Sequence, residues 1–68
     1  MTEKFVVTGM TCAACAAHVE KAASSLDGVD SAAVNLMLGT LVCSYDADRV
    51  SPQAIITAVE TAGYGAAP

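Results

Sequence analysis

The 68-residue sequence has no tryptophan and only three aromatic residues, two tyrosines and one phenylalanine. Basic residues are equally scarce, because three lysines and arginines face seven acidic residues and the formal net charge is −4 at pH 7. A protein that binds nucleic acid would carry a basic stripe or aromatic side chains that stack on bases. The composition therefore argues against nucleic-acid binding, and the acidic balance favours a basic protein surface as the partner.

Long apolar runs are also missing. A membrane-spanning helix needs about 20 consecutive apolar residues, and no run in the sequence approaches that length. Residues 1–10 lack the charged and then apolar pattern of a signal peptide. The sequence therefore predicts a cytoplasmic segment that does not itself insert into a membrane.

The length allows a single domain, residues 1–68, with one small core. A core of this size gives a stability of roughly 3 to 5 kcal/mol. Much of the hydrophobic content is alanine, so large core formers are few. Apart from several valines they are Phe5, Leu26, Leu36, Leu38, Leu41, Ile55 and Ile56.

Three cysteines are too few for the disulfide framework of a small secreted domain. Two of them, Cys12 and Cys15, lie three residues apart in the segment Gly9-Met10-Thr11-Cys12-Ala13-Ala14-Cys15. In a reducing compartment this spacing is typical of a metal site or of a redox dithiol. From the spacing alone the two thiols could close on one soft metal ion or on each other as a disulfide.

Periodicity and turn residues predict the order of the secondary structure elements. We expect strands at 3–9, 30–37 and 41–46, a short last strand at 64–67, and helices at 13–26 and 52–62. Ser51 is the expected N-cap of the second helix, and Asp27-Gly28 the expected end of the first. The expected buried faces are Cys15, Val19, Ala22 and Leu26; Ala32, Val34 and Leu36; Leu41, Cys43 and Tyr45; and Ile55, Val59 and Ala62.

This order is the ferredoxin-like βαββαβ sandwich, an α+β fold in which two helices cover one face of a four-stranded antiparallel sheet. In that topology the loop after the first strand lies beside the loop after the second helix. We therefore expect Tyr64 near the two cysteines. The third thiol, Cys43, is expected in the core, and His18 is expected to be solvated on its helix.

The segment from Gly9 to Cys15 resembles the GMTCxxC signature of the heavy-metal-associated domain, which occurs in copper chaperones and at the N-terminus of copper-transporting P-type ATPases. Val34-Asn35-Leu36, Tyr45-Asp46 and Ala62-Gly63-Tyr64 resemble the family as well, so the likeness covers nearly the whole chain. The resemblance implies a metal-binding domain without catalytic activity. It also implies that Met10 packs under the cysteine loop.

Cys12 and Cys15 are thus the predicted metal ligands, with Met10, Thr11 and Tyr64 around them. Thiolates are soft ligands that suit Cu(I), and Ag(I) shares this preference, whereas Zn(II) usually takes four ligands. Thr11 stands where family members that prefer divalent ions often carry an acid. Two opposed sulfurs on one ion would lie roughly 4.6 Å apart. Backbone N–H groups at the helix start are expected to lower the pKa of Cys15.

The predicted function is Cu(I) binding and transfer by thiolate exchange. The resemblance fits a free-standing cytosolic copper chaperone and the N-terminal domain of a copper-exporting P-type ATPase. Cys-Ala-Ala-Cys and the small-residue tail 65–68, which looks like the beginning of a linker, favour the ATPase domain, whose parent protein would be integral to a membrane. The partners would be a copper chaperone or other ATPase domains.

We expect the domain to be a monomer, with a copper-bridged dimer as the other state. The alternative from the enzyme class is a dithiol–disulfide oxidoreductase. No phosphorylated-aspartate motif and no P-loop occurs in these residues, so ATP hydrolysis is not expected of them.

Overall fold

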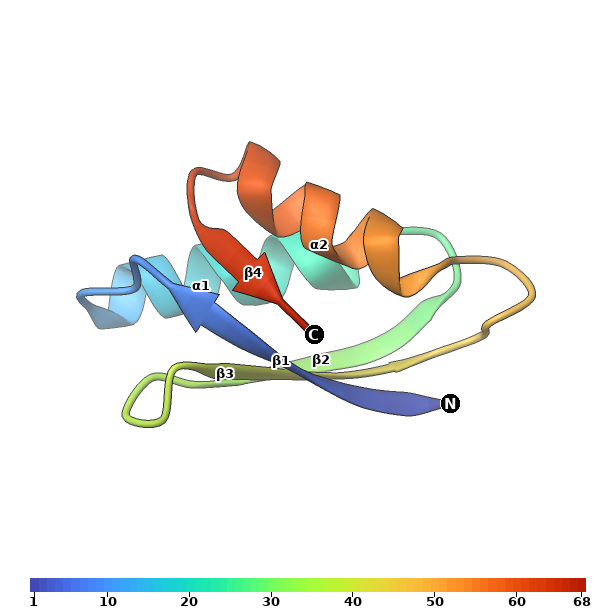
Figure 1. Ribbon diagram of the computed structural model, residues 1–68, viewed down its shortest axis with the longest axis horizontal. Helices are drawn as coiled ribbons and strands as arrows, with labels where there is room; N and C mark the ends of the chain where they lie inside the picture. The colour runs from blue at the N-terminus through green and yellow to red at the C-terminus, as the bar shows by residue number, and fades with distance from the viewer.

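The computed structural model describes residues 1–68, which form four strands and two helices (Figure 1). In chain order these are β1 (Thr2–Thr8), α1 (Ala13–Ser24), β2 (Val29–Asn35), β3 (Thr40–Tyr45), α2 (Pro52–Thr61) and β4 (Gly65–Ala67). The predicted order of elements is confirmed. α2 begins as expected, because the Ser51 hydroxyl accepts a hydrogen bond from the Ala54 N–H at 3.3 Å and Pro52 occupies the first turn.

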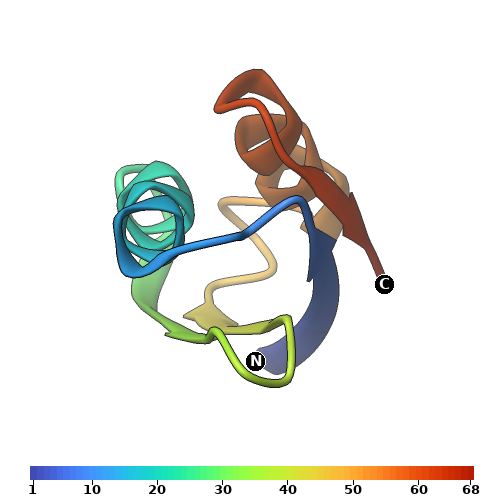
Figure 2. The same ribbon diagram turned by 90° about the vertical axis from the view of Figure 1, so that its left-hand side faces the viewer.

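The sheet is antiparallel, with the strand order β2-β3-β1-β4. β1 is therefore central, and Val6 pairs with Thr40 of β3 on one side and with Ala67 of β4 on the other. β2 and β3 form the predicted hairpin, in which Asn35 pairs with Thr40. Both helices lie on the same face of the sheet (Figures 1 and 2). The predicted ferredoxin-like α+β fold is thus confirmed.

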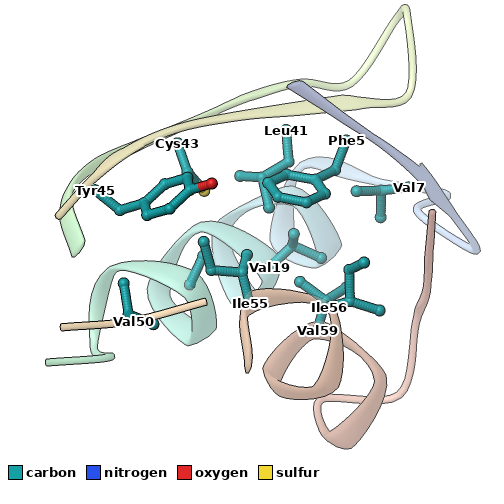
Figure 3. Close-up of a cluster of buried hydrophobic side chains, with 11 residues drawn as sticks. Phe5, Val7, Val19, Leu41, Cys43, Tyr45, Val50, Ile55, Ile56 and Val59 are labelled. Atoms are coloured by element: carbon teal, nitrogen blue, oxygen red, sulfur yellow. The ribbon is translucent and has the colours of Figure 1, made fainter. Parts of the chain in front are cut away.

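The core fills the space between the sheet and the helices (Figure 3). Its members come from the inward faces of β1 and β3, from the facing sides of both helices, and from the loop before α2. They are Phe5, Val7, Val19, Ala23, Leu41, Cys43, Tyr45, Val50, Ile55, Ile56 and Val59. Each large apolar side chain among them contributes roughly 1.5 to 3 kcal/mol through burial, so a core this small depends on every member.

The first helix is shorter than predicted, because α1 ends at Ser24 rather than at Leu26. The hydroxyls of Ser24 and Ser25 donate hydrogen bonds to the Lys21 and Ala22 carbonyls. Serine side chains that bond to the backbone in this way compete with the helical pattern. The chain then reverses at Gly28, whose φ of 98° is the left-handed conformation expected of this glycine.

The predicted buried faces of the two helices were wrong at one position each. Ala23 rather than Ala22 is fully buried in α1, and Ile56 rather than Ala62 joins Ile55 and Val59 in the core. α1 is rich in alanine, and residues of equal size do not show which side of the helix faces the core. Ala62 lies beyond the last residue of α2, where the chain already turns to solvent.

Two leucines expected in the core are exposed. β2 ends at Asn35, so the alternation that was to bury Leu36 stops one residue earlier, and Leu36 is 38% exposed. Leu38 is 70% exposed in the turn that leads to β3. The Leu38 N–H donates to the Asn35 side-chain oxygen at 3.1 Å. This contact closes a tight turn that leaves the intervening side chains in solvent.

Candidate metal site

The two cysteines follow the point where the chain leaves the sheet. β1 ends at Thr8, and Gly9 turns the chain with a φ of 90°. The Tyr64 ring lies 3.6 Å from the place that a Cβ of residue 9 would take, so the ring packs directly on this glycine. Cys12 is the N-cap of α1, and Cys15 lies in its first turn. The predicted position of the pair between a strand and a helix start is confirmed.

Both cysteines of the pair are free thiols, and their sulfurs are 3.3 Å apart. Cys12 is exposed and Cys15 is half-buried. The Cys12 side chain makes no capping bond to the helix, unlike the serine or aspartate usual at an N-cap, so its sulfur can face Cys15. The separation exceeds the roughly 2.05 Å of a disulfide and falls short of the roughly 4.6 Å of two opposed ligands on one ion.

Hydrogen bonding lowers the pKa of the Cys15 thiol below its ordinary value. Its pKa falls from 9.0 to about 6, chiefly through the Tyr64 hydroxyl and then through the Thr11 backbone and the Cys12 side chain. The same contact with Cys15 raises the pKa of Tyr64. The predicted direction is confirmed, but the main cause is Tyr64 rather than the helix N–H groups. At neutral pH Cys15 is mostly a thiolate.

Tyr64 reaches the cysteines because α2 and β4 are joined by a short turn. Gly63 adopts a φ of 103°, and the Tyr64 N–H bonds to the Val59 carbonyl at 3.2 Å. The next residue, Gly65, pairs with Thr8 at the end of β1. The predicted position of Tyr64 beside the cysteine loop is therefore confirmed, and β-sheet register is what places it there.

The other candidate side chains fall into two groups. Met10 is partly buried and packs against the core, as expected, and the Thr11 hydroxyl oxygen lies 3.9 Å from the Cys15 sulfur. Cys43 is fully buried, and burial raises its pKa to about 11, which suits a core residue (Figure 3). His18 is exposed. Cys43 and His18 thus occupy the places that the sequence predicted for them.

The site is a surface feature built on two sulfurs. No cluster of three histidine, cysteine, aspartate or glutamate side chains is close enough to hold a metal ion, and no pocket opens into the domain. The donor set offered by the structure is therefore the Cys12 and Cys15 pair. Neither helix has the length and apolar character needed to cross a membrane.

Comparison with known proteins gives consistent matches over nearly the whole chain. The sequence profile of the heavy-metal-associated domain matches residues 4–65. A copper-exporting P-type ATPase of Staphylococcus saprophyticus is 42% identical over 67 residues, which are 98% of this chain and 8% of the ATPase. The copper chaperone CopZ of Bacillus subtilis is 44% identical over 61 residues, which are 90% of this chain and 88% of the chaperone.

The fold also matches solved structures closely. A structure described as CopZ metallochaperone superimposes with a TM-score of 0.95 and 37% sequence identity, over 98% of this chain and 100% of that one. The chain thus spans most of the chaperones and less than a tenth of the ATPase that it matches.

Proposed function

Since the chain belongs to the heavy-metal-associated domain family, we propose that Cys12 and Cys15 bind one Cu(I) ion and pass it to a partner by thiolate exchange. The chain is a small, non-catalytic metal-binding domain. The observation that carries the proposal is the pair of free thiols, 3.3 Å apart at a helix start, of which Cys15 has a pKa of about 6. Two thiolates on an open loop can hold a soft ion and release it to other thiolates.

The donor set favours a monovalent soft ion. Zn(II) sites in proteins are usually four-coordinate, and here no third histidine, cysteine, aspartate or glutamate side chain stands close enough to the two sulfurs to share a metal ion with them. Thr11 supplies a hydroxyl rather than a carboxylate, so a divalent ion would find no charged oxygen ligand at that position. Ag(I) has the same preference for two sulfurs as Cu(I), and we expect it to bind at the same place.

The side chains around the pair have separate roles in this proposal. The Tyr64 hydroxyl stabilises the Cys15 thiolate and keeps it ready for metal at neutral pH. A hydrogen bond from the Thr11 backbone also lowers the pKa of Cys15. Met10 anchors the loop by packing on the core, so that the two sulfurs stay on the surface. On metal binding the sulfurs separate from 3.3 Å toward the roughly 4.6 Å of two opposed ligands.

Transfer follows from low coordination. An incoming thiolate of the partner forms a third bond to the ion, and one of the two original sulfur–metal bonds then breaks. Cys12 is the more exposed sulfur, so we expect the partner to attack on its side and Cys12 to be released first. A second exchange completes the transfer. The ion keeps at least two sulfur ligands throughout, its oxidation state does not change, and no free metal is formed.

Two settings use this chemistry, a domain of a copper-exporting ATPase and a free cytoplasmic chaperone, and the chain resembles both kinds of protein. We assign it to the ATPase because of Cys-Ala-Ala-Cys and the Gly-Tyr-Gly-Ala segment that follows α2. Its partners are then a copper chaperone and the other domains of the ATPase. Immunoblotting of native cells after denaturing electrophoresis distinguishes the two possibilities, because the ATPase is more than ten times longer than the chaperone.

Competition with a Cu(I)-specific chelator under reducing conditions tests the proposed binding. We expect one Cu(I) per chain in the wild type and loss of that binding in the double variant Cys12→Ser, Cys15→Ser. Cys43→Ala is the matched control, because it removes the buried thiol and should keep full affinity. Retention of affinity by the double variant would refute the proposal.

A depressed thiol pKa also suits a dithiol–disulfide oxidoreductase. Reduction of insulin disulfides distinguishes the two functions. We expect no acceleration above an ordinary dithiol, whereas catalytic turnover would favour the enzyme.

A further inference from the structure

The turn between α1 and β2 contains an aspartate followed by a glycine. Asp27-Gly28 is the only place in the sequence where an aspartate or asparagine precedes a glycine. The turn lies at the end of the molecule opposite the loop that carries the cysteines (Figure 1). An aspartate can isomerise when the amide nitrogen of the next residue attacks its side chain, and a glycine has no side chain to obstruct the attack. The sequence therefore places one such bond in an exposed turn.

Both reacting groups of this turn are accessible in the folded chain. The Asp27 side chain is 87% exposed. The Val29 N–H donates to the Leu26 carbonyl at 3.2 Å, so Asp27 and Gly28 are the two central residues of a tight turn. The Gly28 N–H takes part in no hydrogen bond, either with the backbone or with a side chain. The nitrogen can therefore react without the loss of a backbone hydrogen bond of its own.

The loop between β3 and α2 packs on this turn and restrains the aspartate. The Asp46 N–H donates to the Gly28 carbonyl at 2.8 Å, and a Cβ on Gly28 would lie 2.8 Å from the Arg49 Cβ. The Arg49 guanidinium also forms an ion pair with the Asp27 carboxylate. The two side chains are 56% and 87% exposed. Because exposed ion pairs are weak, this one can slow a movement of the carboxylate but cannot prevent it.

We propose that this turn is a site of spontaneous modification, at which Asp27 converts to isoaspartate through a cyclic succinimide while the chain is folded, and that Arg49 restrains the conversion. The Gly28 nitrogen bonds to the carbon of the Asp27 carboxyl group, and one carboxyl oxygen leaves as water with the amide proton and a proton from solvent. Water then adds to the main-chain carbonyl carbon of the ring, and the bond from that carbon to the nitrogen breaks. The nitrogen regains a proton, and the new carboxyl group releases one. No oxidant, reductant or other reactant is needed, and the mass of the chain is unchanged.

Isomerisation lengthens the main chain in a turn that has no room for it. One methylene group of the aspartate side chain becomes part of the backbone between α1 and β2. Gly28 cannot shift toward Arg49, which it already contacts, and a shift away would break the bond from the Asp46 N–H to the Gly28 carbonyl. We therefore expect the isomerised chain, once separated by chromatography and refolded, to unfold at a lower urea concentration than the unmodified chain. An equal urea midpoint would contradict this account of the turn.

The test compares the rate of isomerisation in the folded and the unfolded wild type. Reduced apo chain is incubated in mildly acidic buffer with and without guanidinium chloride. Isoaspartate is quantified with an isoaspartyl methyltransferase and located with an endoproteinase that cuts before aspartate but not before isoaspartate. A folded domain of this size populates its unfolded state to about 1% or less. We expect the folded chain to react at about a tenth of the unfolded rate or faster, which unfolded molecules alone could not supply.

Three variants separate the reaction from the restraint on it. Asp27→Glu keeps the charge but needs a six-membered ring, which closes far more slowly, so no isomerised residue should appear at this position. Arg49→Met keeps the side-chain carbons beside Gly28 and removes the ion pair, so the rate should rise about two- to fivefold, as expected for the loss of an exposed pair. Lys4→Met is the matched control, because it removes the same charge from an exposed position on β1 and should react at the wild-type rate.

Two results would overturn the modification site. One is a folded-state rate no greater than the unfolded rate multiplied by the unfolded fraction from urea titration. The other is isoaspartate at Asp30, Asp46 or Asp48 as often as at Asp27. A wild-type rate in Arg49→Met would overturn the restraint by the ion pair, as would a faster rate matched by an equal rise in the unfolded fraction of that variant.

Discussion

The Tyr64 hydroxyl is the contact that most strongly sets the acidity of Cys15, and Tyr64→Phe removes it with little change in shape. The pKa of Cys15 falls from 9.0 to about 6 through four hydrogen bonds, of which that from Tyr64 is the largest. The largest of four contributions exceeds a quarter of their sum. We therefore expect the pKa of Cys15 to rise by about one pH unit in the variant. At pH 7 its thiolate fraction then falls from about 90% to about half.

The assay is the ¹³C chemical shift of the Cys15 β-carbon in the metal-free chain, followed from pH 4 to pH 10. It reports on Cys15 alone, whereas absorbance at the thiolate band would mix the cysteines. Tyr45→Phe is the matched control, because Tyr45 bonds to Glu3 in another part of the fold and its hydroxyl does not touch the cysteines. An unchanged titration of Cys15 in Tyr64→Phe, within about 0.2 pH units, would refute this account of the site.

Three more predictions concern the scaffold. Leu41→Ala removes a fully buried side chain and should lower the free energy of unfolding by about 2 to 5 kcal/mol. Because this is close to the whole stability of a domain this size, circular dichroism should show a largely unfolded chain. Gly28→Ala places a Cβ 2.8 Å from the Cβ of Arg49 at a φ of 98° and should lower the free energy of urea unfolding by about 1 to 3 kcal/mol; Gly63→Ala, with no atom within 4 Å, should lose less. The pKa of Cys15 is about 6 in the folded chain and 9.0 when the thiol is free, so the unfolded chain holds more protons between these pH values. The urea midpoint of the apo wild type should therefore rise with pH across that window. Cys15→Ser should abolish the rise.

The sequence predicted the order of elements and the position of the thiols because both depend on local signals. Gly9 ends a strand, Ser51-Pro52 starts a helix, and the spacing of Cys12 and Cys15 is visible in the letters themselves. The neighbourhood of Tyr64 followed from the topology, since the last strand must return beside the first. These inferences needed no knowledge of side-chain packing.

Other features depend on packing and on where the chain turns, which local patterns do not determine. Leu36 and Leu38 look like core residues by type. Leu36 is exposed because β2 ends at Asn35, two residues before its predicted end, and Leu38 is exposed in the turn that follows. The buried stripe of α1 could not be phased because Ala22 and Ala23 have the same size. The chief cause of the low pKa of Cys15 is the hydroxyl of Tyr64, which lies far away in the sequence.

The central position of β1 has a consequence for how the chain reaches its fold. Of the strands of this domain β1 is synthesised first, but its two neighbours are β3 and β4, and Val6 pairs with Ala67 across almost the whole domain. Contacts between distant residues close large loops and slow folding relative to a helical bundle of equal length. During synthesis the β2–β3 hairpin can form before β1 is paired on both sides. The sheet around the cysteine loop is complete only when the last three-residue strand has been added.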